Sequence, residues 1–322
     1  MKLAILDDYQ RVALQSADWK KLGVDIHVFH EAFRSLDDAA EKLRPFDILC
    51  AMRERTAFSR ALIERLPNLK FVSLTGFRAV SMDSQFLGER GIPVSNTRIG
   101  NGTTATAELT WGLIIAAARA MEQGMRNMRE GRWHEGLPAG IGLAGKRLGL
   151  LGLGKIGSAV GRVGKAFGMD VVAWSQNLTP EKAAEQGARH VAKEELVATA
   201  DVVSIHLVLG DRTRGLVGAK ELAAMKQGAI LVNVSRGPII DEAALLEALS
   251  GSRIHAALDV YDREPLPADH PLRKLPNVTL APHLGYVNDE TYRIFHEDSV
   301  ENVAAWLAGK PIRVMNAEHL KK

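Results

Sequence analysis

The chain has 322 residues, of which 46% are hydrophobic and 25% charged, the balance of an ordinary globular protein. This length exceeds one ordinary hydrophobic core and predicts two domains. The formal net charge is +3 and no long basic run occurs, so composition gives no support for binding to nucleic acid or to a membrane surface.

Cys50 is the only cysteine, so no disulfide can form within the chain and a reducing, cytoplasmic location is expected. It ends an apolar run, which favours a buried small hydrophobe over a nucleophile. The apolar run at the N-terminus is too short for a secretory signal, and no stretch reaches the ~18 apolar residues that span a membrane. We therefore expect no membrane or nucleic-acid partner, and we predict no metal site.

The first ~100 residues alternate strand-like and helix-like segments, a pattern that predicts a small α/β domain. A long, Ala-rich apolar helix is expected over Thr104–Ala120, where it would link two halves of the chain and offer a contact to another subunit. The Gly-rich segment Glu122–Gly145 is expected to be an extended arm. The predicted strands of this first part are Lys2–Leu6, Asp25–Phe29, Ile48–Ala51, Phe71–Leu74 and Pro93–Val94.

Beyond Gly145 the alternation of strands and helices is clear. Six strands are predicted, the count of a complete dinucleotide-binding fold. Helical segments such as Glu242–Leu249 connect most of them, and a last helix, Glu290–Leu307, is expected to return to the first domain. The six strands are Arg147–Leu151, Val171–Trp174, Val202–Leu207, Ala229–Val234, Ile254–Val260 and Val278–Ala281.

The first of these strands runs into a glycine-rich turn, Gly152-Leu-Gly154-Lys155-Ile156-Gly157. Such spacing lets the backbone turn tightly, approach a pyrophosphate and pack a following helix close to the sheet. A helix is predicted over Ser158–Gly168. The turn therefore predicts a dinucleotide site, and a structural turn without a ligand is the alternative interpretation.

Ionisable residues follow three other predicted strands. Arg236 comes after Ala229–Val234, Asp259 and Glu264 come at and after the end of Ile254–Val260, and His283 follows Val278–Ala281. In open α/β sheets the ligand lies outside the carboxyl ends of the strands. We therefore expect these side chains at the same edge as the glycine turn.

Four stretches together resemble the D-isomer-specific 2-hydroxyacid dehydrogenase family, which includes D-3-phosphoglycerate dehydrogenases and glyoxylate/hydroxypyruvate reductases. They are the glycine turn at 152–157 and residues 232–237, 259–265 and 282–285. The resemblance implies an α/β fold of two domains. A Rossmann cofactor domain, residues 100–287, would be inserted into a smaller flavodoxin-like α/β substrate domain, residues 1–99 plus 288–322.

The resemblance also implies catalytic roles for Arg236, Glu264 and His283. Reduction of a 2-keto acid needs a hydride at the carbonyl carbon and a proton at its oxygen. Imidazole titrates near neutrality, so His283 suits proton transfer in both directions. Glu264 would orient the ring and favour its protonated form, and Arg236 would offer paired donors to the carboxylate and carbonyl. Taken alone, each of these three residues would be interpreted as an ordinary residue of the surface, a turn or a loop.

The resemblance implies NAD as the cofactor, with NADP as an alternative. An acid at the end of the second cofactor-domain strand usually selects NAD, but here Ser175-Gln176-Asn177 follow that strand, and Asp170 lies at its other end. Asp259 would lie near the nicotinamide carboxamide, or be a turn-forming Asp. His206 would form a backbone wall for the cofactor. The implied cofactor contacts are Gly152, Gly154, Lys155, Ile156, Gly157, Ser175, Gln176, His206, Val234, Asp259 and Gly285.

The substrate side departs from the family pattern. The family often has Gly-x-Gly-x-Asp after the fourth N-terminal strand, whereas this chain has Gly76-Phe77-Arg78-Ala79-Val80. The N–H groups of Gly76 and Phe77 are expected to bind a substrate carboxylate. Arg78 would bind a second anionic group or lie solvated at the surface, and Arg53 matches a family position near the substrate. For Tyr286 and Trp133, core packing is favoured over lining the pocket.

The resemblance thus implies an oxidoreductase that transfers a hydride between a nicotinamide cofactor and a small D-2-hydroxy acid/2-keto acid, and it also implies a homodimer. Formate dehydrogenase is a related alternative, but it pairs its histidine with Gln where this chain has Glu264. A nucleotide-sensing binding protein like the corepressors of this fold is a second alternative, which the same three residues do not exclude.

Overall fold

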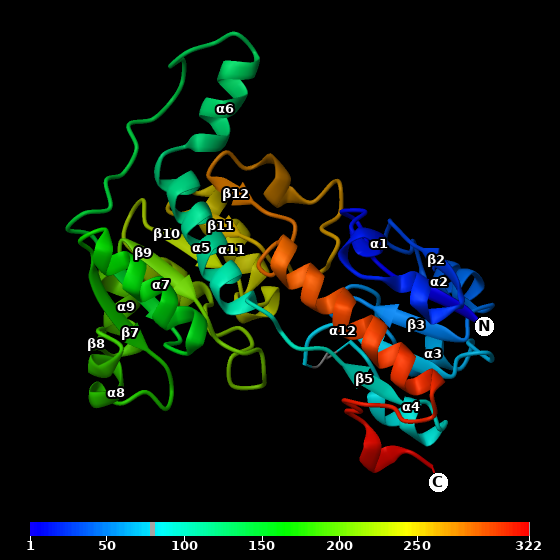
Figure 1. Cartoon of the computed structure of the whole chain (residues 1–322). Helices are drawn as coiled ribbons and strands as arrows, with labels where there is room; N and C mark the ends of the chain where they lie inside the picture. Colours follow the sequence, from blue (N-terminus) through cyan, green and yellow to red (C-terminus); the bar gives the residue numbers. More distant parts are fainter. Residues whose placement is uncertain (78–80, 322) are drawn as a thin grey trace. The chain divides into compact units, whose positions relative to one another are not determined.

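Two units make up the computed structural model, which describes residues 1–77 and 81–321 (Figure 1). Unit 1 consists of Met1–Asn101 with Asn288–Lys322, and unit 2 is Gly102–Val287. Unit 2 is therefore an insertion into the sequence of unit 1. The predicted α/β fold of two domains, one inserted in the other, is confirmed. Among the described residues, no helix is long and apolar enough to cross a membrane.

Unit 1 contains a parallel five-stranded sheet in the order β2-β1-β3-β4-β5. Two clusters of buried side chains cover its two faces, one around Phe58 and Leu62 and the other around Trp19 and Phe71. The strands are β1 (Lys2–Ile5), β2 (Asp25–Val28), β3 (Ile48–Ala51), β4 (Phe71–Leu74) and β5 (Val94–Asn96). The helices are α1 (Ala13–Ser16), η1 (Trp19–Leu22), α2 (Leu36–Leu43), α3 (Arg60–Ile63), α4 (Ser84–Glu89), α12 (Asp289–Leu307) and η4 (Ala317–His319).

Helix α12 is joined to the unit 1 sheet by buried polar side chains. Asn302, which is fully buried, donates to Ser73 Oγ at 3.2 Å and to the Asn96 carbonyl at 3.0 Å. Asp298 accepts the Arg98 backbone N–H at 2.8 Å and its guanidinium at 2.7 Å. Each buried polar group is thus paired with a group more than 190 positions away in sequence, which fixes the last helix on the first domain.

Unit 2 contains a parallel seven-stranded sheet in the order β12-β11-β10-β9-β6-β7-β8. Six of the strands match the predicted ones, and the seventh, β8, is a two-residue strand that has no apolar run to signal it. The strands are β6 (Arg147–Leu151), β7 (Asp170–Trp174), β8 (Arg189–His190), β9 (Val202–Ile205), β10 (Ile230–Asn233), β11 (His255–Leu258) and β12 (Val278–Leu280).

Helices cover both faces of this sheet. The apolar helix α5 lies alongside α7 (Figure 1), and the Trp111 indole of α5 donates to the Val160 carbonyl of α7 at 3.2 Å. A Cβ on Gly164 of α7 would lie 2.7 Å from Leu148 Cδ2, so glycine lets α7 pack closely on β6. The helices of unit 2 are α5 (Gly102–Ala118), α6 (Met121–Arg129), α7 (Lys155–Ala166), α8 (Pro180–Glu185), α9 (Lys193–Thr199), α10 (Ala219–Ala224), η2 (Gly237–Ile239), α11 (Glu242–Ser250) and η3 (Pro271–Lys274).

The expected extended arm over Glu122–Gly145 is wrong in its first part, because residues 121–129 form helix α6. Ala120 follows the end of α5 and is the N-cap of α6; its left-handed φ of 48° separates the apolar α5 from α6, which is amphipathic. Asn127 is buried and donates to the Glu135 carbonyl at 2.8 Å, so the following segment folds back on α6. The core packing favoured for Trp133 is also wrong, since its side chain is 65% exposed.

Candidate active site

The carboxyl edge of the unit 2 sheet gathers the chemically active residues. Five adjacent strands end there, in the order β12, β11, β10, β9 and β6. Parallel strands place the residues that follow them on one side of the sheet. The residues that follow these five strands are His283, Asp259, Arg236, His206 and Gly152.

The glycine turn is shaped by close backbone packing. Gly152 has a φ of 102°, and a Cβ there would lie 2.6 Å from the His206 carbonyl oxygen. A Cβ on Gly157 would lie 2.1 Å from the Gly152 carbonyl oxygen. Gly154 differs, because a Cβ on it would meet no described atom within 4 Å. Two glycines are therefore required by packing, and the third borders open space, as a ligand site requires.

Helix α7 starts directly at this open space. Gly154 is its N-cap and offers no side chain, and the first turn, from Lys155 and Ile156 on, holds no acidic residue. The N–H groups and positive dipole end of the helix therefore point to where an anion can bind. The turn fits the pyrophosphate of a nicotinamide dinucleotide. Helix α7 begins at Lys155, three residues before the predicted start at Ser158, because the glycines of the turn are poor helix formers and give no sign of a helix.

Ser175 and Gln176 follow β7 beside the glycine turn. The Gly152 N–H donates to the Trp174 carbonyl at 2.8 Å, which fixes the end of β7 next to this turn. Gln176 is exposed. Asp170 lies at the opposite end of the strand and pairs with Arg147 at 2.8 Å. The three residues directly after β7, Ser175 to Asn177, therefore include no carboxylate for a ribose hydroxyl.

His283 and Glu264 form a hydrogen-bonded pair. His283 is 8% exposed, and its Nδ1 lies 2.5 Å from Glu264 Oε2. The other carboxylate oxygen, Oε1, accepts the Tyr261 backbone N–H at 3.0 Å. The carboxylate is thus fixed by the backbone and in turn orients the imidazole ring. Tyr261 was not assigned a role from the sequence, although it lies within the matching stretch at 259–265.

Arg236 lies on a loop that is tied from within. Asn233 Nδ2 donates to the Arg236 carbonyl at 2.9 Å, and the Arg236 guanidinium donates to the Ser235 carbonyl at 2.6 Å. A Cβ on the next residue, Gly237, would lie 2.1 Å from the Tyr261 carbonyl carbon. Only glycine therefore lets the Arg236 loop pack directly against the loop that leads to Glu264.

Two further residues of this edge have structural partners. Asp259 is fully buried and accepts hydrogen bonds from the Leu284 and Gly285 N–H groups. Burial raises the pKa of its carboxyl above the ordinary value, and these two bonds and the nearby His283 offset only part of that rise. His206 Nε2 lies 2.9 Å from Ser204 Oγ, and burial lowers the pKa of His206 to about 3. A neutral His206 is unsuited to donate a proton near neutrality. Val234, predicted to contact the cofactor, is buried at the end of β10.

The predicted substrate residues Arg53, Gly76 and Phe77 lie in unit 1. Gly76 has a φ of 76°, and a Cβ there would lie 2.8 Å from Arg53 Cδ, so the turn needs glycine. The Gly76 N–H donates to Thr97 Oγ1 at 2.8 Å, so a substrate carboxylate would share this donor. Phe77 is 64% exposed. Arg78 lies outside the described residues.

The comparisons with known proteins agree on one family. The family described as D-isomer specific 2-hydroxyacid dehydrogenase, NAD binding domain, matches residues 111–285. Glyoxylate reductase of Aeropyrum pernix is 41% identical over 269 residues, which cover 81% of this chain and 80% of that protein. The chain belongs to the D-isomer-specific 2-hydroxyacid dehydrogenase family. The matched range lies within unit 2, so this unit contains the NAD-binding domain of the family.

Other members of the D-isomer-specific 2-hydroxyacid dehydrogenase family extend the likeness to the whole chain. The structure of phosphoglycerate oxidoreductase from Vibrio cholerae O395 has a TM-score of 0.90 at 39% identity and covers 96% of this chain and 99% of that one. D-3-phosphoglycerate dehydrogenase of Archaeoglobus fulgidus is 34% identical over 91% of this chain, which spans only 55% of that relative. The protein is therefore a hydroxyacid-dehydrogenase-type oxidoreductase that binds a nicotinamide cofactor.

Proposed function

We propose that the protein transfers a hydride between NAD(H) or NADP(H) and carbon 2 of a small D-2-hydroxy acid/2-keto acid pair. The pair of His283 and Glu264 carries this proposal, because it puts an oriented imidazole at the sheet edge where the glycine turn begins α7. The cofactor supplies or accepts the hydride when bound. All other steps fall to side chains of this chain.

His283 acts in this proposal as acid in reduction and base in oxidation. Glu264 holds Nδ1, so proton transfer to the substrate oxygen uses Nε2. The negative charge of Glu264 favours the protonated ring, the form that reduction needs. As the proton leaves, the imidazole becomes neutral and ready for the reverse reaction.

Arg236 binds the substrate carboxylate and carbonyl oxygen. Its planar guanidinium offers paired donors, which suits both groups of a 2-keto acid. A positive charge at the carbonyl oxygen stabilises the negative charge that develops there during reduction. Arg53, Gly76, Phe77 and Arg78 remain our proposal for the contribution of unit 1 to substrate binding.

The cofactor preference rests on the residues after β7. We propose NAD as the cofactor with NADP also accepted, because neither a carboxylate to repel a 2′-phosphate nor an arginine to bind one stands at Ser175-Gln176-Asn177. Asp259 and Gly285, at the far side of the same edge, are proposed to border the nicotinamide end. His206 contributes backbone.

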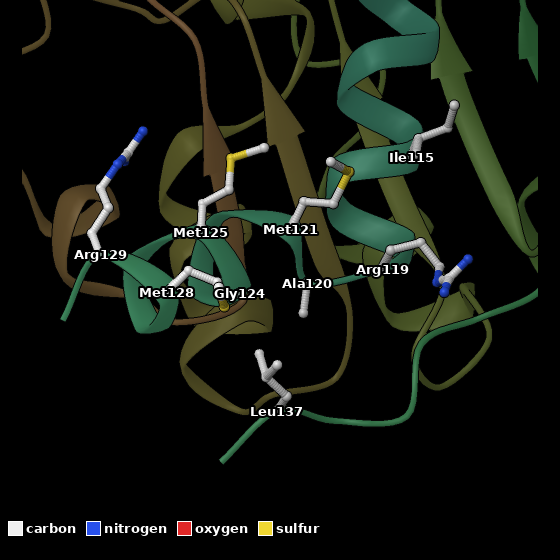
Figure 2. Close-up of a pocket in the computed structure, with 9 residues that line it drawn as sticks. All are labelled: Ile115, Arg119, Ala120, Met121, Gly124, Met125, Met128, Arg129 and Leu137. Atoms are coloured by element: carbon white, nitrogen blue, oxygen red, sulfur yellow. The ribbon is translucent and has the colours of Figure 1, made fainter. Parts of the chain in front are cut away.

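A homodimer is proposed from an exposed apolar groove. Its volume is about 670 Å³, and Figure 2 shows Met121 and Met125 of α6 and Leu137 of the following segment lining it. Met125 and Met128 are 50% and 57% exposed. Flexible thioethers on an exposed helix are typical of interaction surfaces, and a second copy of the chain offers the matching apolar face.

One screen tests the proposed function. Purified protein is mixed with NADH or NADPH and with glyoxylate, hydroxypyruvate or phenylpyruvate, and loss of the reduced cofactor's absorbance is followed. We expect turnover with at least one keto acid and with NADH. Tight NADH binding without turnover of any 2-keto acid would instead support a nucleotide-sensing binding protein.

A further inference from the structure

His283 has an unusual backbone conformation. Its φ is 55°, in the left-handed region that favours glycine. A non-glycine residue in this region persists only where its surroundings fix the chain. The contacts of the neighbouring peptide groups therefore help to place the imidazole ring, which Glu264 orients.

The two residues after His283, Leu284 and Gly285, are held from one side by a buried carboxylate. Asp259, directly after β11, accepts the Leu284 N–H at 2.6 Å and the Gly285 N–H at 2.9 Å, one with each oxygen. The side chain of Asp259 is fully buried, so these charge-assisted bonds do not compete with bulk water. The two residues that follow His283 are thus anchored to the neighbouring strand.

From the other side, the segment is held by a hydroxyl of α5. Thr106 Oγ1 lies 2.8 Å from the Gly285 carbonyl oxygen and 2.7 Å from the Gly102 carbonyl oxygen. Its single proton is shared between the first turn of α5 and the His283 loop. A Cβ on Gly285 would lie 3.2 Å from Asp259 Oδ2 and 3.4 Å from Thr106 Oγ1, so glycine fits between both anchors.

We propose that Thr106 is a positioning residue for His283, acting with Asp259 as a clamp on residues 284 and 285. The clamp holds His283 in its left-handed conformation and so aims the imidazole at the reacting carbonyl. This inference rests on the proposed role of His283 in proton transfer. Thr106 precedes the four stretches that carry the family resemblance and is separated from Gly285 by 179 positions.

The chain offers a matched control for Thr106. Thr110 lies one turn further along α5, is fully buried, and donates its hydroxyl to the Thr106 carbonyl at 2.7 Å. Both threonines bond the carbonyl four residues earlier in the helix, and only Thr106 also reaches the His283 loop. Thr106→Val and Thr110→Val each delete one buried hydroxyl at nearly constant volume, and the two variants differ in the clamp alone.

Steady-state reduction of the keto acid found by the screen gives the first readout. We expect Thr106→Val to lower kcat by about tenfold, because small displacements of a reacting group have effects of this size or larger. The NADH affinity and Tm of Thr106→Val should equal those of Thr110→Val. Thr106→Ser, which keeps the hydroxyl, should restore kcat. A kcat for Thr106→Val equal to that of Thr110→Val overturns the proposal.

A second readout needs no turnover. In cofactor-free protein, the ¹H–¹⁵N signals of the His283 ring, assigned by their absence in His283→Ala, should shift in Thr106→Val and stay in place in Thr110→Val. Unchanged ring signals in Thr106→Val contradict the clamp. If the signals shift but the wild type reduces no 2-keto acid, the clamp stands and the proposed function fails.

Discussion

Glu264 illustrates how one side chain can orient another only when it is itself held. Its carboxylate bonds the Tyr261 N–H at 3.0 Å and His283 Nδ1 at 2.5 Å. The first bond fixes its position and the second transmits both orientation and charge to the ring. The placement of Arg236, His283 and Glu264 at one edge of the sheet is predictable from sequence, because each follows a strand within a recognisable motif. Tyr261 and Thr106 are not, since their roles depend on backbone contacts across the fold.

Replacing Glu264 by Gln should move the pH profile of keto-acid reduction toward acid. The carboxylate 2.5 Å from Nδ1 favours the positively charged ring, and the neutral amide of Gln would not. The measurement is kcat/KM against pH for wild type and Glu264→Gln. Glu242→Gln is the control, because Glu242 pairs with His270 at 3.4 Å in the same unit. Superimposable profiles for wild type and Glu264→Gln would show that the charge of Glu264 does not act on His283.

Replacing Gln176 by Asp should make the enzyme reject NADPH. A carboxylate directly after β7 accepts hydrogen bonds from ribose hydroxyls and repels a 2′-phosphate at the same place. We expect kcat/KM for NADPH to fall by tenfold or more, an order-of-magnitude figure for one unfavourable charge contact, with little change for NADH. Gln186→Asp, which adds the same charge beyond α8, is the control. An unaltered NADPH/NADH ratio would mean that Gln176 does not face the ribose.

At the scale of elements, the buried strands are the most predictable part of the fold. Their apolar runs are bounded by turn residues, and β3 and β4 begin and end as predicted. Errors arise where the pattern is weak. Helix α6 is amphipathic, but it opens a Gly-rich segment that also contains Pro138, and this composition favours an extended arm over a helix. The predicted strand Val202–Leu207 ends early at Ile205, because apolar residues continue into the turn after β9.

The attachment of α12 to the unit 1 sheet gives a testable pH dependence. Asp298 is 1% exposed; burial raises its pKa, but its bonds to Arg98 outweigh this and leave the pKa below its usual value. A depressed pKa means that the bonds stabilise the fold at neutral pH and that this stabilisation is lost as pH falls below about 4.

Asp298→Asn should therefore lower Tm by several degrees at neutral pH, and the gap to wild type should narrow as pH falls below about 4. Thermal unfolding followed by circular dichroism at a series of pH values measures this. Glu301→Gln is the control, because Glu301 is 59% exposed where it pairs with Arg313 and such pairs contribute little. A gap between wild type and Asp298→Asn that does not change with pH would contradict the account.

At the scale of the whole molecule, the inserted arrangement follows from a chain that leaves unit 1 at Asn101 and returns at Asn288. The motifs of unit 2 make the cofactor unit predictable from sequence, because each marks a strand end at one sheet edge. The substrate loop of unit 1 is less predictable. Gly76 matches the first glycine of the family pattern, but the residues after it differ from that pattern. The Gly76 N–H also donates a hydrogen bond to Thr97 Oγ1, which the sequence does not indicate.

The proposed homodimer is tested by charge on α6. Introducing Met125→Glu and Met128→Glu together should convert a dimer to a monomer, because burying two carboxylates in an apolar interface is costly. Analytical ultracentrifugation of the wild type and this variant measures the mass. Leu14→Glu, at a position 57% exposed in unit 1, is the control and should stay dimeric. A monomeric wild type, or a doubly substituted variant that remains a dimer, would contradict the proposal.

The most direct test of the account is the His283→Ala variant, assayed for keto-acid reduction and for NADH binding in the same preparation. The account predicts that kcat falls by about 10²–10⁴-fold, the usual contribution of a general acid. It predicts unchanged NADH affinity, because the glycine turn and the start of α7 hold the pyrophosphate. Near-wild-type turnover in His283→Ala would contradict the central claim that His283 transfers the proton.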